Sequence, residues 1–137
     1  AKGISSANYS NNLRRLCSMI KNNNALPILQ TYYCPMYHEG REGFERDFEI
    51  LMQINREISK EMDLPIIDQY KIFEPFYRND KNEYKKLMRD WIHLNHLGNL
   101  IMGMNVSKYF GLPDVKIPED IQGELKPLIG QMFRYTV

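Results

Sequence analysis

The sequence has little of what would mark a disulfide-rich, nucleic-acid-binding or membrane protein. Its two cysteines, Cys17 and Cys34, are too few for a disulfide framework and are expected to be ordinary thiols. Eighteen basic and 17 acidic residues leave a formal charge of +1, which gives no reason to expect nucleic acid or an acidic membrane surface as a partner. No apolar run approaches the roughly 20 residues that span a bilayer, and residues 1–8 lack the apolar core of a signal peptide. These absences favour a cytoplasmic location over a secreted one.

What is present is the composition of an ordinary globular domain. The chain has 137 residues, about the length of one domain. Apolar residues make up 43% and charged residues 26%, and nine Tyr, six Phe and one Trp are enough for a real core. Disorder is not expected, since low hydrophobicity with high net charge is absent. Residues 1–137 are therefore predicted to form a single domain.

The first part of the chain predicts a helix followed by a strand. Apolar side chains spaced by three and four residues predict a helix over residues 8–21, with Ser5 or Ser6 as its N-cap. The short apolar and aromatic segment 26–34 predicts a buried strand, with Pro27 confined to its first residues. Such a strand is expected to be covered on both faces.

A second helix and strand follow in the same order. The spacing of apolar residues predicts a long helix from Phe44 to Met62, and Leu64–Asp68 predicts a second short strand. Two such units favour a layered α/β fold with parallel strands.

The rest of the chain is less regular. The aromatic and charged segment 70–86 contains Pro75, which is expected to break any long helix there. A third helix is predicted over residues 95–110, and residues 114–137, with weak helical signals, are predicted to form a C-terminal wrapping tail.

Histidines carry the candidate chemistry. His93 and His96 would share a face if they lay on one helix, but zinc needs three or four ligands, so neither a metal nor a cofactor is expected. Asp90 and His93 are more informative. A carboxylate that accepts from the imidazole Nδ1–H fixes the tautomer and leaves Nε2 as a base, as in catalytic triads. The alternative is a surface histidine beside a helix cap.

The segment around this pair reads Asp90-Trp-Ile-His93-Leu-Asn95-His-Leu-Gly98-Asn. It resembles the last motif block of the SGNH hydrolases, also called the GDSL lipase and esterase family, whose pattern is Asp-x-x-His-Leu-Asn, a Gly three residues on, and then a helix. The resemblance is specific from Asp90 to Gly98 and only architectural over about residues 4–113. It implies that this α/β chain is the C-terminal portion of a flavodoxin-like three-layer α/β/α fold, with two parallel strands plus helices.

The resemblance also implies roles for single residues. His93 would be the general base that takes the proton from a serine, and Asp90 would orient it and stabilise its cation. Ile92 would lie near the acyl pocket and Trp91 would flank it, which makes both candidates for substrate binding, although a plain packing role is an equal alternative.

The family's other motifs are absent. The sequence contains neither the Gly-Asp-Ser that carries the nucleophile nor the Gly-x-Asn-Asp that contributes to the oxyanion hole. The chain is therefore expected to be the C-terminal half of an SGNH hydrolase domain, with the serine and the oxyanion hole in a missing N-terminal half or a partner chain.

Two functions follow as hypotheses. The first is a serine ester hydrolase (lipase, esterase or acylhydrolase) that acts on a small ester, with acetylated sugars and small acyl esters preferred because no long apolar lid is evident. The second is a non-catalytic α/β protein-interaction module that uses apolar faces and the aromatic segment 70–84. A homo-oligomer is compatible with either, and nucleic acid is not expected because no basic stripe occurs.

Overall fold

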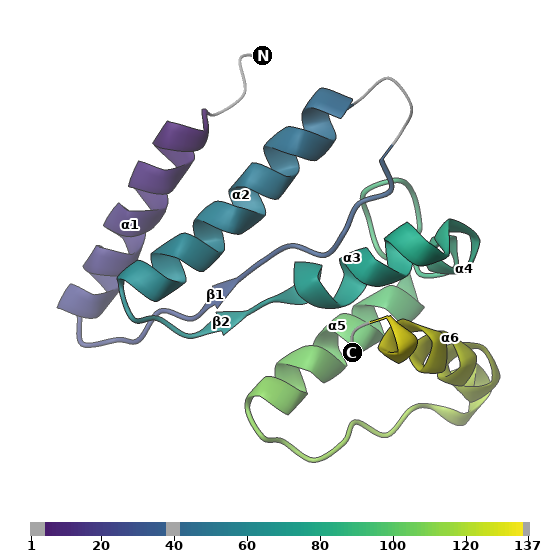
Figure 1. Cartoon of the computed structure of the whole chain (residues 1–137). Helices are drawn as coiled ribbons and strands as arrows, with labels where there is room; N and C mark the ends of the chain where they lie inside the picture. The colour runs from purple at the N-terminus through teal and green to yellow at the C-terminus, as the bar shows by residue number, and fades with distance from the viewer. Residues whose placement is uncertain (1–4, 38–41, 136–137) are drawn as a thin grey trace. The chain divides into compact units, whose positions relative to one another are not determined.

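The computed structural model describes residues 5–37 and 42–135, and these fall into two compact units (Figure 1). The first unit contains the chain up to Thr31 and again from the start of the second long helix to Ile67, and the second contains residues 32–37 and the chain from Asp68 onward. The chain is mostly helical with two parallel strands, which confirms the α/β class. None of the described helices is long and apolar enough to cross a bilayer.

The first unit has the predicted order of helix, strand, helix, strand. Its elements are α1 (Ser6–Asn22), β1 (Leu29–Gln30), α2 (Glu42–Glu61) and β2 (Ile66–Ile67). The Ser5 hydroxyl accepts from the Asn8 backbone N–H at 3.2 Å, as expected of an N-cap. The strands are parallel, with Leu29 opposite Ile66 and Gln30 opposite Ile67.

The strand predicted over residues 26–34 is much shorter than expected, and its burial differs from the prediction. Pro27, Leu29 and Thr31 are buried, whereas Ile28 and Gln30 between them are exposed. This alternation is the pattern of a strand covered on one face. Within the described part of the chain, this segment is therefore covered on one face, and cover of the second face by a missing half or partner stays a prediction.

The core of the first unit lies between its helices and its strands. Cys17, Leu29, Ile58 and Leu64 are buried together, with Leu13, Ile54, Met62 and Ile66 packed around them. Figure 1 shows α1 and α2 side by side, and two polar contacts join them. The Arg14 guanidinium contacts the Glu61 carboxylate at 2.6 Å, and the Asn55 amide donates to the Tyr9 hydroxyl at 2.8 Å. Exposed ion pairs contribute little, so apolar burial supplies most of the stabilisation.

The second unit is helical and is built around aromatic side chains. Its elements are α3 (Gln69–Asn79), α4 (Lys81–Lys85), α5 (His96–Tyr109), the 3₁₀ helix η1 (Glu119–Ile121) and α6 (Gln122–Arg134). Its buried aromatic residues are Tyr33, Tyr70, Phe73, Phe76, Tyr77 and Tyr84. The last five come from the segment that the interaction-module hypothesis expects to form an interface. That part of the hypothesis is wrong, because the segment forms this unit's core.

Both prolines in the second unit's helices lie inside them. Pro75 is within α3, so the expectation that it would break a helix there is wrong, and Pro127 is within α6. Apolar side chains flank both prolines. Phe73 and Phe76 are fully buried beside Pro75, and burial of such rings offsets a missing backbone hydrogen bond. In the predicted C-terminal tail, α6 packs against α3, and its buried side chains are Leu125, Leu128 and Met132.

Candidate active site

The Asp90–His93 segment is a tight loop between α4 and α5. Met88 and Leu94 form an antiparallel bridge across the loop, and the Arg89 N–H donates to the His93 carbonyl at 2.8 Å. His93 precedes the start of α5, so it does not share a helix face with His96 as the spacing suggested. His38, the third histidine, lies outside the described residues.

Asp90 and His93 are in direct contact. The Asp90 carboxylate oxygens lie 2.8 and 3.0 Å from His93 Nδ1. One of them also accepts the backbone N–H groups of Ile92, at 3.0 Å, and of His93, at 2.8 Å. These hydrogen bonds, first that of Ile92 and then that of the imidazole, lower the pKa of Asp90 from 3.8 to about 2. The carboxylate is thus held ionised at neutral pH.

The pairing has one consequence for the imidazole. An ionised carboxylate only accepts, so in neutral His93 the proton resides on Nδ1 and Nε2 carries a free lone pair. The His93 side chain is 54% exposed and that of Asp90 is 42% exposed. Within residues 5–37 and 42–135 no hydroxyl or thiol is hydrogen-bonded to Nε2. The geometry provides an oriented base that is open to a group from outside the described residues.

Sequence reasoning missed Tyr33, whose side chain is hydrogen-bonded to the backbone of the Asp90–His93 loop and of Leu94. Its side chain is buried, and its hydroxyl donates to the Ile92 carbonyl at 2.6 Å and accepts from the Leu94 N–H at 3.2 Å. One oxygen atom therefore joins the peptide groups on both sides of His93. Alternating burial along 27–33 was the available signal, because it turns Tyr33 inward and a buried tyrosine hydroxyl usually has a partner.

Trp91 and Ile92, the candidate substrate-binding residues, are both half-buried. Their backbone carbonyls have structural partners, since that of Trp91 accepts from the Met36 N–H at 2.8 Å and that of Ile92 accepts from Tyr33. The loop is thus fastened to residues 33–36 through its backbone. The role of the two side chains in substrate binding stays a prediction.

Asn95 and Gly98 connect the loop to α5. The Asn95 side-chain oxygen accepts from the N–H groups of Leu97 and Gly98, and its amide donates to the Lys86 carbonyl at 2.7 Å. A Cβ atom on Gly98 would lie 2.5 Å from the Leu87 carbonyl oxygen, so only glycine fits there. Asn95 is therefore the N-cap of α5 and Gly98 permits its close approach to the loop.

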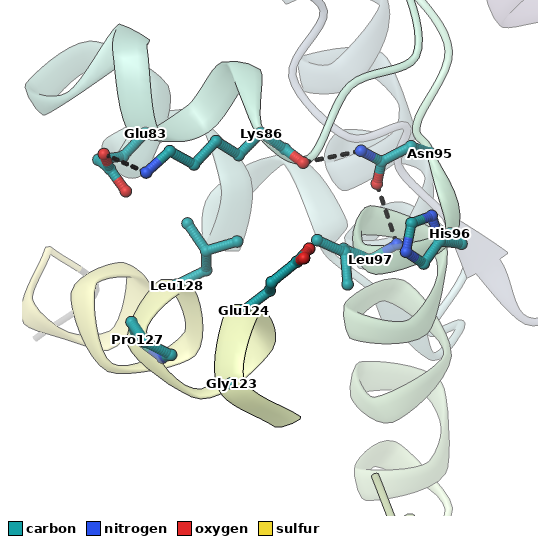
Figure 2. Close-up of a pocket in the computed structure, with 9 residues that line it drawn as sticks. All are labelled: Glu83, Lys86, Asn95, His96, Leu97, Gly123, Glu124, Pro127 and Leu128. Atoms are coloured by element: carbon teal, nitrogen blue, oxygen red, sulfur yellow. Dashed lines mark hydrogen bonds and ion pairs between the residues drawn. The ribbon is translucent and has the colours of Figure 1, made fainter. Parts of the chain in front are cut away.

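A groove lies beside the first turn of α5 (Figure 2). Its volume is about 490 Å³. The side chains of Glu83, Lys86, His96, Leu97, Glu124 and Leu128 line it, together with Asn95, Gly123 and Pro127. Trp91 and Ile92 are not among these lining residues.

The two thiols are poor candidates for a nucleophile. Cys17 and Cys34 are unpaired with one another and buried, as expected for ordinary thiols. Burial raises the pKa of both, so little thiolate is present at neutral pH. Among the described residues, no group of three His, Cys, Asp or Glu side chains is placed to hold a metal ion.

No protein-family model matches the chain, and the curated proteins gave no match either.

Proposed function

We propose that this chain is the part of an SGNH-type serine ester hydrolase that carries His93 as the general base and Asp90 as its orienting carboxylate. The reaction is acyl transfer to water through an acyl-serine. The serine and the oxyanion hole belong to a segment or partner chain outside these residues, and the fold as a whole is the C-terminal portion of a flavodoxin-like three-layer α/β/α domain.

The observation that supports this proposal is the geometry of the Asp90 carboxylate. It contacts His93 Nδ1 at 2.8 Å and is itself held by two backbone N–H groups. A base that must accept a serine proton through Nε2 needs this arrangement, since it fixes the tautomer and stabilises the imidazolium that forms.

Some motif residues have a structural role in the fold, and the His93 ring does not. Asn95 caps α5, Gly98 allows close packing and Leu94 is buried. The His93 ring, in contrast, is exposed, and its only hydrogen bonds in the described chain are those to Asp90. A fold that needed only a loop and a cap would have no use for this imidazole, which favours a chemical role.

The test is mutation of the base in the complete natural protein that contains these residues. We expect His93→Ala to lower the rate of p-nitrophenyl acetate hydrolysis by roughly 10⁴- to 10⁶-fold, since removing a triad member has effects of that size. Because the ring is exposed, the far-ultraviolet circular dichroism should be unchanged, and the thermal midpoint should fall only slightly through the lost hydrogen bond to Asp90. Asp114→Asn, an exposed aspartate beyond α5, is the control and should retain full activity.

Two outcomes would contradict the proposal. Activity retained by His93→Ala would remove His93 from the mechanism. Wild-type-like turnover by the isolated 137 residues would show that the nucleophile lies within them.

A second candidate function is a non-catalytic interaction module. It is favoured by three apolar side chains of the first unit that are more than half exposed: Leu16 and Met19, each 54%, and Leu26, 64%. The two functions differ in what accompanies the chain. An intact mass of the native protein, with the sequence of any co-purified chain, decides between them, since only the hydrolase requires a Gly-Asp-Ser segment.

A further inference from the structure

The groove of Figure 2 begins where the Asp90–His93 loop ends. His96, one of its lining residues, is three residues from His93, so their Cα atoms lie at most about 11 Å apart. His93 itself does not line the groove, but a sugar ester is long enough to span a distance of this size. We propose that this groove binds the alcohol moiety of the ester, and that this moiety is a sugar or another polyol. The assignment to a substrate rests on the proposed hydrolase function, whereas the binding of a polyol is testable without it.

The groove presents both donors and acceptors of hydrogen bonds. Lys86 forms an ion pair with Glu83 at 2.6 Å, so on this side a cation and a carboxylate stand next to each other. Figure 2 shows the Glu124 side chain extending from α6 on the other side, and His96 at the start of α5. Hydroxyl groups both donate and accept, so a polyol can engage each of these groups.

Apolar residues lie between the polar ones. Leu97 and Leu128 are buried and line the groove together with Pro127. A sugar ring presents C–H groups on its faces and hydroxyls at its edge, which matches apolar residues surrounded by polar side chains. The volume of about 490 Å³ falls within the range of small-ligand sites.

Two other ligand classes fit less well. A hydrocarbon acyl chain in the groove would strip water from Glu83, Lys86 and Glu124 without replacing the lost hydrogen bonds, which is unfavourable. An anion would face the Glu124 carboxylate, which has no ion pair within residues 5–37 and 42–135, because Lys86 is already neutralised by Glu83. Two of the first N–H groups of α5, those of Leu97 and Gly98, are also already bonded, since they donate to the Asn95 side chain.

Gly123 provides a way to fill the groove without disturbing the fold. It lines the groove, and an added Cβ would meet no atom within 4 Å. Gly130 lies on the same helix, α6, has the same free space, and is not among the lining residues. Gly123→Leu and Gly130→Leu are therefore a matched pair that differ in whether the new side chain enters the groove.

The experiment titrates the complete natural protein that contains these residues with methyl β-glucopyranoside and follows backbone amide signals by NMR. We expect the signals of His96, Leu97 and Glu124 to shift with saturation. Gly123→Leu should weaken binding by about tenfold or more, and Glu124→Gln by several-fold, while Gly130→Leu binds as the wild type does. Sodium hexanoate, the acyl-chain probe, should leave these signals in place.

The proposal is overturned if the glycoside causes no shift at these residues, if hexanoate shifts them as strongly, or if Gly123→Leu binds the glycoside as well as Gly130→Leu does. Because the titration needs no nucleophile, its failure is separate from that of the hydrolase proposal, which the His93→Ala assay decides.

Discussion

At the scale of single residues, the loop from Asp90 to Gly98 assigns a different physical task to each member of its motif. Asp90 accepts from two backbone N–H groups and from the imidazole, Asn95 caps a helix, and Gly98 avoids a clash with a carbonyl. Tyr33 lies outside the motif in sequence but joins the peptide groups on both sides of His93. Under the hydrolase proposal, Tyr33 is therefore a positioning residue for His93.

Tyr33→Phe tests that role. The variant leaves the buried Leu94 N–H without its acceptor, so we expect the free energy of unfolding to fall by about 1–3 kcal/mol in denaturant titrations. Under the hydrolase proposal, the looser loop in the complete protein should lower kcat while KM stays constant, because His93 no longer keeps its orientation. Tyr32→Phe is the control. Tyr32 is 38% exposed, and its hydroxyl is hydrogen-bonded to that of Tyr33 at 2.8 Å and reaches the Ile92 carbonyl at 3.3 Å. The buried Leu94 N–H donates to Tyr33 and keeps its acceptor in Tyr32→Phe, so the losses should be smaller. Equal effects of the two variants would argue against a special role for Tyr33.

At the scale of elements, helix positions follow local signals and helix contacts follow packing. The caps of α1 and α5 lie at a serine and an asparagine, residue types favoured there because their oxygens accept from free N–H groups. Pro75 in α3 and Pro127 in α6 are exceptions to the rule that a proline interrupts a helix. Apolar burial along these helices outweighs the hydrogen bond that each proline removes.

Replacing either of two glycines of α5, Gly98 or Gly103, by alanine is expected to change the free energy of unfolding in opposite directions. An added methyl group at Gly98 would approach the Leu87 oxygen to 2.5 Å, whereas at Gly103 nothing lies within 4 Å. Gly98→Ala should therefore destabilise the protein by about 1–3 kcal/mol through overpacking. Gly103→Ala should stabilise it by about 0.5–1 kcal/mol, since alanine is the better helix former. Thermal or urea unfolding of both variants provides the measurement. A stabilising Gly98→Ala would mean that α5 does not pack against the loop in this way.

At the scale of the whole molecule, the chain consists of two compact units, each with its own core. The first unit contains the two parallel strands, and segment 27–31 is covered on one face by the described residues. In the hydrolase proposal the missing half of the domain would supply further strands and cover. The dependence of the unfolding free energy on pH is also a property of the whole molecule.

Acid should destabilise the chain partly through Asp90. Its pKa is lowered from 3.8 to about 2 by the folded loop, so the stability it contributes is present above pH 3.8 and is lost as pH falls through about 2. We expect the difference in unfolding free energy between wild type and Asp90→Asn to be larger at pH 6 than at pH 2. Urea titrations at both values measure it, and Asp114→Asn reports the effect of removing a negative charge at an exposed position. A difference independent of pH would contradict the hydrogen bonding described for Asp90.

The sequence by itself determined the long helices, the N-cap of α1 and the Asp90–His93 pair, because these depend on residues three or four apart along the chain. The parallel direction of the two strands followed from the alternation of helix and strand along the chain. Only the tertiary structure decided that segment 70–84 forms a core, that Tyr33 holds the peptide groups on both sides of His93, and that a groove follows the loop. Each of these depends on residues distant in sequence, such as Tyr33 and Ile92 or Lys86 and Glu124, whose meeting is set by packing rather than by periodicity.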